Sequence, residues 1–323
     1  NLSNFSKLID GTTDIKDIVN FNDLNYTQFE IEIINSFLNW ENDEKNIAVF
    51  NISNIALEYC LISNKKGNAF KLESLKDKVF YLDTNIIFRA IGINGEFRKH
   101  RITTFLNKLL EAKETLVISK FTFEEIKSTI KYYVSTLNRK YSSKINSNIF
   151  IKYSTNADFL EFYHIWRKNR SNDSLELFEA FLLGEIDKIK TEFKIKYDFN
   201  IDIDFTDKKI EEIILDKASS INTYKTNEKN YSNYIEASVI DAKNIYLIEK
   251  KRNYQYFNIF DCKYYFISSD QYLRKWDYSI NRTVPTVILP SQWMSLLLRY
   301  LNRSSDDFKS FVSFLNISNN EKF

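Results

Sequence analysis

The stretch that decides the fold of this chain is Val79-Phe80-Tyr81-Leu82-Asp83-Thr84-Asn85. Its first four residues form an apolar run, which is typical of a parallel strand buried on both faces. An acid, a threonine and an asparagine end the run. In open α/β sheets the ligand lies beyond the carboxyl ends of the strands. The stretch therefore predicts a parallel α/β sheet with a polar site after this strand.

Short apolar runs and helical patterns alternate along much of the chain. Further strands are expected at 115–118, 264–267 and 286–289, with helices between them. This alternation favours an open sheet of parallel strands. Strictly alternating residues predict a half-exposed strand or hairpin arm at 199–205, and residues 150–192 predict a long, interrupted helical region.

The composition excludes several classes of protein. The 323 residues include only 5 Gly and 2 Pro, which argues against a sandwich of many tight turns. Cys60 and Cys262 lack CxxC spacing, so neither a disulfide framework nor a zinc site is expected, and a reducing cytoplasm is the expected location. His100 and His164 leave little material for a histidine metal site. No apolar run is long enough to predict a membrane span.

The charge is unevenly distributed along the chain. The formal net charge is only +2, but residues 1–75 carry 11 acids against 6 lysines, and residues 98–144 carry 11 basic residues against 4 acids. A basic stretch beside an acidic site suits a polyanionic substrate. The alternative is an ordinary solvated helix face.

Four acids form the candidate site: Asp83 and Asp270 follow expected strands, and Glu125 and Asp241 lie on expected helices. Carboxylates that meet repel each other unless a cation lies between them, and Mg²⁺ and Mn²⁺ take oxygen ligands. Each acid also has a structural alternative. Asp83 and Asp270 can cap helices, Glu125 can face solvent, and Asp241 can pair with a buried lysine.

Four short motifs, taken in chain order, resemble those of the PIN domain family of nucleases. They are Leu82-Asp83-Thr84-Asn85, Ser119 through Glu125-Ile126, Asp241-Ala242, and Ser268-Ser269-Asp270. The resemblance covers about residues 79–300. It implies a PIN-like three-layer α/β/α fold with a central parallel sheet.

The resemblance also divides the chain into regions. We expect an N-terminal helical region at 1–76, a PIN-like nuclease domain at 77–306 and a C-terminal tail at 307–323. A long helical insertion at about 141–231 departs from compact members of the family. The N-terminal region lies outside the resemblance.

The resemblance implies a metal-dependent endonuclease, a hydrolase that cleaves phosphodiester bonds in nucleic acid, with RNA favoured over DNA as the substrate. Its one or two Mg²⁺ or Mn²⁺ ions would be held by Asp83, Glu125, Asp241 and Asp270, which would also be the catalytic residues. Asn85 and Ser268 would be polar supports. Basic residues near the motifs, which could hold phosphates or be plain surface charges, are Lys120, Lys127, Arg274 and Lys275.

Other functions remain open at this point. A catalytically silent PIN-like module in a larger assembly would use the N-terminal region or the insertion to bind a protein partner. A phosphatase of the haloacid dehalogenase type is disfavoured, because it needs a second acid where this chain has Asn85. A dinucleotide-binding enzyme is disfavoured because no GxGxxG follows a strand. No membrane partner is expected.

Overall fold

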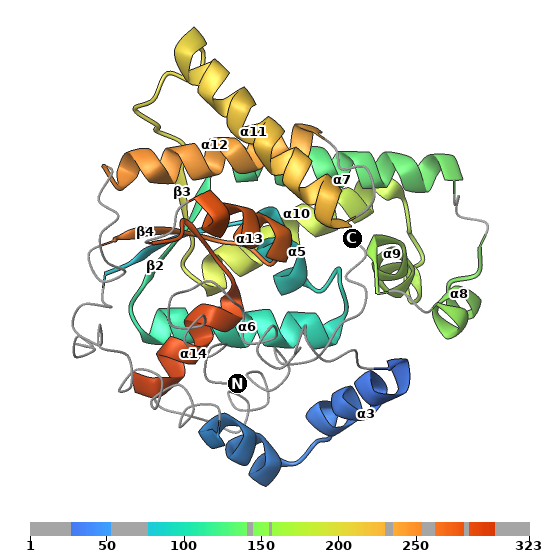
Figure 1. The fold of residues 1–323 in the computed structure, drawn as a ribbon. Helices are drawn as coiled ribbons and strands as arrows, with labels where there is room; N and C mark the ends of the chain where they lie inside the picture. The colour runs from blue at the N-terminus through green and yellow to red at the C-terminus, as the bar shows by residue number, and fades with distance from the viewer. Residues whose placement is uncertain are drawn as a thin grey trace.

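The computed structural model describes residues 27–52, 77–140, 145–154, 157–229, 235–253, 262–280 and 284–300. These residues form a five-stranded parallel sheet surrounded by helices (Figure 1). The strands are β1 (Val79–Leu82), β2 (Thr115–Ser119), β3 (Lys196–Asp198), β4 (Tyr264–Ile267) and β5 (Val287–Ile288). The expected α/β class with a parallel sheet is confirmed.

The strand order is β3-β2-β1-β4-β5. The chain builds outward from β1 to β2 and β3, then returns to place β4 on the other side of β1. The β1–β4 ladder pairs Leu82 with Ile267, and the Asp83 amide donates to the Ile267 carbonyl at 3.0 Å. A reversal of strand order opens a crevice at the carboxyl ends of the two strands concerned. Here the strand order reverses between β1 and β4.

Side chains alternate between the two faces of the sheet. Phe80 and Leu82 of β1 enter one core, and Tyr81 enters the other. The first core includes α5 (Thr84–Ile91), α6 (Glu96–Glu111), α10 (Leu175–Glu192) and α14 (Pro290–Tyr300). The second includes α11 (Lys208–Lys229), α12 (Ile235–Lys251) and α13 (Gln271–Ile280). The same alternation places Asp83 on the Tyr81 side, toward the second group of helices.

The segment 141–231 is built into the body of the fold. Besides α8 (Ser147–Tyr153) and α9 (Phe159–Arg167), it supplies β3, α10 and α11. Phe178 and Leu182 of α10 are fully buried in the first core. The helix α7 (Lys120–Lys140), which precedes this segment, contacts both α10 and α12. The helices expected within 150–192 are therefore present, and α10 packs against α5 and α7 in the first core.

The strand expected at 199–205 is wrong. The strand ends at Asp198, and the chain then bends and turns toward α11. Asp204 stabilises this turn by accepting from the amide and the hydroxyl of Thr206, at 2.9 and 2.6 Å. Ile201 and Ile203 pack against the second core. The alternation therefore reflects side chains that reach the core from a segment without a ladder partner.

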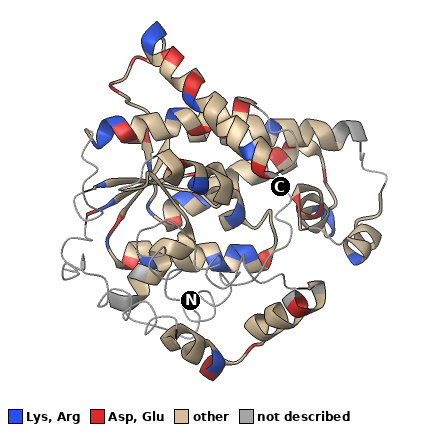
Figure 2. Ribbon diagram, in the orientation of Figure 1, with Lys and Arg blue, Asp and Glu red and all other residues tan. Residues whose placement is uncertain are grey.

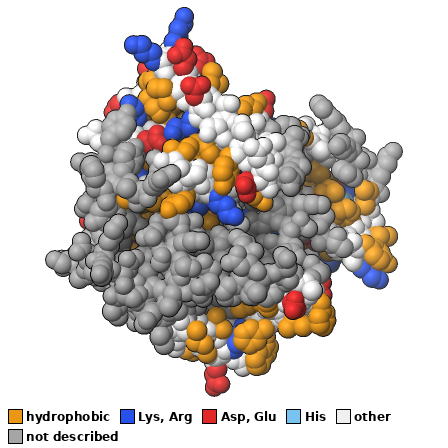
Figure 3. Space-filling model, viewed as in Figure 1, with side chains coloured by type: hydrophobic (Ala, Val, Ile, Leu, Met, Phe, Trp, Pro, Cys, Tyr) orange, Lys and Arg blue, Asp and Glu red, His pale blue; other side chains and the backbone are white. Residues whose placement is uncertain are grey.

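The helix α3 (Gln28–Asn39) and a second helical stretch at 43–52 lie at the periphery. Phe29, Ile33 and Phe37 of α3 are exposed, and hydrophobic side chains are visible on this part of the surface (Figure 3). The rest of the expected N-terminal region and the expected tail at 307–323 lie outside the described residues. None of the described helices combines the length and apolarity needed to cross a membrane.

Candidate functional site

Asp83 lies at the carboxyl end of β1 and is buried. Its Oδ1 accepts from the Thr84 amide at 2.7 Å and so caps α5. Its Oδ2 accepts from Nδ2 of Asn85 at 2.5 Å and from the hydroxyl of Ser268 at 2.6 Å. Asp83 is therefore a helix cap, which was the structural alternative to a site role. The same side chain also links the end of β1 to the end of β4.

Asn85 and Ser268 fix this junction. Nδ2 of Asn85 also lies 3.1 Å from the Ser268 hydroxyl oxygen, and Oδ1 of Asn85 accepts from the Ser269 amide at 3.0 Å. The Ser268 hydroxyl oxygen accepts from the Asp270 amide at 3.0 Å. These bonds tie Asp83 and Asp270 into one polar network.

Asp270 has two roles as well. Its Oδ1 accepts from the amides of Tyr272 and Leu273, at 2.9 and 3.2 Å, which caps the start of α13. Its Oδ2 lies 2.7 Å from Nζ of Lys225 on α11. The same ammonium lies 2.7 Å from Oδ2 of Asp241 on α12. Lys225 therefore bridges two of the four acids, and the expected alternative of a buried lysine partner for Asp241 is observed.

Glu125 reaches the site from α7. Its Oε2 accepts from the hydroxyl of Thr84, the residue next to Asp83. The helix begins directly after β2, where the Ser119 hydroxyl oxygen accepts from the Thr122 amide at 3.1 Å. The end of β2 therefore directs α7, and with it Glu125, toward the end of β1.

A buried asparagine holds α12 against the start of α7. Oδ1 of Asn244 accepts from the Ser119 hydroxyl at 2.5 Å, and its Nδ2 donates to the Thr122 hydroxyl at 3.3 Å. Asn244 lies one helical turn after Asp241. This contact fixes the distance between the helices that carry Glu125 and Asp241.

The four acids act on one another electrostatically. Burial, followed by the charge of Asp241, raises the pKa of Asp83 to about 7, although Ser268 and Lys225 lower it. Burial and the charge of Asp83 raise the pKa of Glu125 to about 8. Burial opposes the charge of Lys225, but Asp241 and Asp270 raise its pKa above the ordinary value. Burial and the neighbouring acids therefore outweigh the effect of the one ammonium on the pKa of Asp83 and of Glu125.

The donor chemistry of this cluster fits a hard divalent cation, because all four acids offer carboxylate oxygens. The present arrangement is nevertheless centred on an ammonium. Within the described ranges, no three His, Cys, Asp or Glu side chains are placed as ligands of one metal ion. Lys225 pairs with an oxygen of Asp241 and an oxygen of Asp270, two of the four acids that would hold the cation.

The four basic candidates differ in exposure. Lys120 and Lys127 on α7 are exposed, and Lys275 is half-buried. Arg274 is buried, and its Nε donates to Oε1 of Gln292 at 3.2 Å, so its geometry is that of a packing residue. Basic and acidic residues are interspersed along the helices (Figure 2). Lys120 and Lys127 remain the accessible candidates for phosphate contacts.

Reasoning from the sequence missed Lys225, although a signal for it exists. Ile214, Ala218 and Ile221 form the buried stripe of α11, and Lys225 occupies the next position of that stripe. A lysine on the apolar face of a helix needs a buried partner. The roles of Thr84 and Asn244 were missed as well, because no spacing distinguishes them from other polar residues.

No family model, curated protein or solved structure matches this chain. The geometry and chemistry of the four-acid cluster are therefore the basis for assigning a function.

Proposed function

We propose that this protein is a PIN-like, metal-dependent nuclease that hydrolyses phosphodiester bonds in RNA. One observation carries the proposal: four carboxyl groups from four separate elements meet where the strand order reverses between β1 and β4. Buried like charges are costly, and folds keep them chiefly where chemistry needs them. The motifs that supply these acids are those that resemble the PIN family.

In this function Asp83, Glu125, Asp241 and Asp270 would hold Mg²⁺ or Mn²⁺. The bound ion would add positive charge at the scissile phosphate and acidify the attacking water. Asn85 and Ser268 orient Asp83 by donating hydrogen bonds to its Oδ2. The exposed lysines at the start of α7 provide positive charge for a polyanionic backbone.

The test uses labelled single-stranded RNA and DNA of the same sequence. With Mn²⁺ the protein is expected to cleave RNA, and EDTA is expected to stop the cleavage. Asp83→Asn is expected to lower the rate at least 100-fold. The matched control is Asp158→Asn, because Asp158 is an exposed N-cap residue on α9 outside the cluster. Circular dichroism checks that both variants fold. Cleavage that persists in Asp83→Asn would remove the proposed site.

A second candidate is a catalytically silent PIN-like module that binds RNA or a protein partner. The ammonium of Lys225 favours it, because a resident cation already neutralises part of the acidic cluster. A silent module is expected to retain labelled RNA on a filter without cleaving it at any Mn²⁺ concentration. Metal-dependent product formation by the purified wild-type protein would exclude this candidate.

A further inference from the structure

We propose that Lys225 is a built-in counter-cation that competes with a divalent metal ion for Asp241 and Asp270. The inference rests on the proposed function, because it concerns the same carboxylates. The observation behind it is a symmetric contact: the ammonium lies 2.7 Å from Oδ2 of Asp241 and 2.7 Å from Oδ2 of Asp270.

The position of Lys225 is fixed from three elements. It is carried by α11, Asp241 by α12, and Asp270 precedes α13. The lysine side chain is only 5% exposed, and the two acid side chains are 13% and 15% exposed. An ammonium buried to this extent is stable only when carboxylates compensate it, so removing one side of such a pair is costly. Lys225 therefore stabilises the acid cluster in the metal-free protein.

The competition follows from charge. A divalent ion bound to the same oxygens would lie close to the ammonium and repel it. Metal binding then requires Lys225 to leave at least one of the two acids. The cost of breaking these ion pairs weakens the observed affinity for the metal. By the same coupling, a bound metal weakens the ion pairs that Lys225 of α11 makes with Asp241 and Asp270. Lys225 thereby sets the metal concentration at which the site fills.

The effect of Lys225 extends beyond its two direct partners. Its charge also lowers the pKa of Asp83 and of Glu125, although burial raises the pKa of both acids more strongly. A single side chain thus offsets part of the repulsion in the whole cluster. Without it, neutralisation of the cluster would depend on protonation of its carboxyl groups or on an external cation.

The experiment compares the wild-type chain with Lys225→Met, which keeps the apolar stem and removes the charge. Isothermal titration calorimetry with MnCl₂ measures the affinity, and thermal unfolding in EDTA measures the metal-free stability. The matched control is Lys217→Met: Lys217 is on the same helix, and its ammonium pairs with Glu249 of α12 at 2.9 Å, outside the cluster. Lys225→Gln serves as a second variant, because its amide can still donate to a carboxylate.

We expect Lys225→Met to have a lower Tm than wild type in EDTA, to bind Mn²⁺ at least tenfold more tightly, and to gain more Tm on Mn²⁺ addition. Lys225→Gln is expected to shift in the same directions, and Lys217→Met to bind Mn²⁺ as wild type does. Equal or weaker Mn²⁺ affinity in both Lys225 variants, or no Mn²⁺ binding by any of the proteins, would overturn the inference.

The two proposals fail separately. If Lys225→Met binds Mn²⁺ more tightly but wild type cleaves no nucleic acid, the competition stands and the nuclease function fails. If wild type cleaves RNA with Mn²⁺ but the Lys225 variants bind Mn²⁺ no better, the nuclease function stands and the competition fails.

Discussion

Two neighbouring glutamates on α7 show how position along a helix separates a candidate site residue from a surface residue. Glu125 is turned inward to accept from the Thr84 hydroxyl, and Glu124 is exposed, where it pairs loosely with Lys120 at 4.0 Å. Sequence spacing could not choose between them. The inward carboxyl carries an electrostatic cost, because burial and Asp83 raise its pKa to about 8. An inward carboxylate of this kind is expected to lower the free energy of unfolding although the proposed site uses it.

Glu125→Gln tests this cost. The glutamine keeps an acceptor for the Thr84 hydroxyl and removes the buried charge, so we expect the free energy of unfolding to rise by about 1 kcal/mol, or about 2 °C in Tm. The comparison is made in EDTA at pH 9, where the wild-type carboxyl is ionised. The Mn²⁺-dependent cleavage of RNA is expected to fall sharply in the same variant.

The control for this prediction is Glu124→Gln, which changes an exposed glutamate one residue away. Exposed pairs of this kind contribute little, so its Tm is expected to stay within about 1 °C of wild type. A Tm for Glu125→Gln below that of the control would show that the buried charge stabilises the metal-free protein.

At the residue scale, the four acids were predictable because each stands at a recognisable place, after an apolar strand or within an apolar helix. The positions of Asn85 and Ser268 beside Asp83 were predictable for the same reason. Lys225 was not, because it is one of 45 Lys and Arg residues in the chain. Only its position on the buried stripe of α11 distinguishes it, and that stripe is visible once the helix boundaries are known.

The junction between β2 and α7 sets the direction of α7 and thereby the position of Glu125. Ser119 has two functions there: its hydroxyl oxygen caps α7 through the Thr122 amide, and its hydroxyl donates to Asn244 of α12. A single side chain thus sets the start of one helix and the position of another.

Ser119→Ala is expected to lower the free energy of unfolding by about 2 kcal/mol, because it removes a cap and a buried hydrogen bond. Urea unfolding followed by circular dichroism measures the change. The control is Ser174→Ala, which removes only the cap of α10 and is expected to cost about 1 kcal/mol. Equal losses in the two variants would show that the bond to Asn244 contributes nothing.

Elements were predictable where the apolar pattern and the hydrogen bonding agree. The strands β1, β2 and β4 lie within a residue of their expected places, and β5 is shortened to Val287–Ile288. The strand predicted at 199–205 was wrong because alternate side chains of this segment reach the core although its backbone pairs with no neighbouring strand. Periodicity reports which side chains are buried and does not report where backbone groups find partners.

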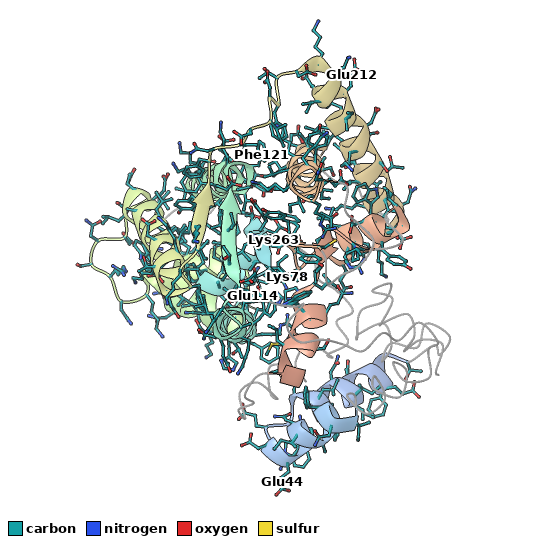
Figure 4. All side chains as sticks on the ribbon, turned by 90° about the vertical axis from the view of Figure 1, so that its left-hand side faces the viewer. Glu44, Lys78, Glu114, Phe121, Glu212 and Lys263 are labelled. Atoms are coloured by element: carbon teal, nitrogen blue, oxygen red, sulfur yellow. The ribbon has the colours of Figure 1, made fainter. Side chains whose placement is uncertain are left out.

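At the scale of the whole molecule, the sheet carries a second buried acid at its opposite end. Glu114 precedes β2, and its Oε2 accepts from the amide of Lys78, which precedes β1, at 2.6 Å. Figure 4 shows these two residues near Lys263, at the amino ends of the strands and away from Phe121, which follows β2. Burial raises the pKa of Glu114 from 4.5 to about 8, although Lys78 lowers it.

The folded protein therefore holds a proton on Glu114 that the unfolded chain releases. Because the folded pKa is raised, the stabilisation from the protonated form is complete below pH 4.5 and is lost as the pH rises through about 8. Glu114→Gln removes this dependence, so the stability difference between the variant and wild type should increase in favour of the variant from pH 5 to pH 8.5. Urea unfolding at four pH values in that window measures it, and parallel curves would contradict the prediction.

The topology of the sheet also decides when the acidic cluster can exist during synthesis. Asp83 and Ser268 lie 185 residues apart along the chain, yet their side chains are hydrogen-bonded across neighbouring strands. A nascent chain from which β4 has not yet emerged lacks Asp270. For most of its synthesis it also lacks Lys225 and Asp241. Under the proposed function, the growing chain cannot cleave the messenger RNA that encodes it until translation has passed β4 and Asp270.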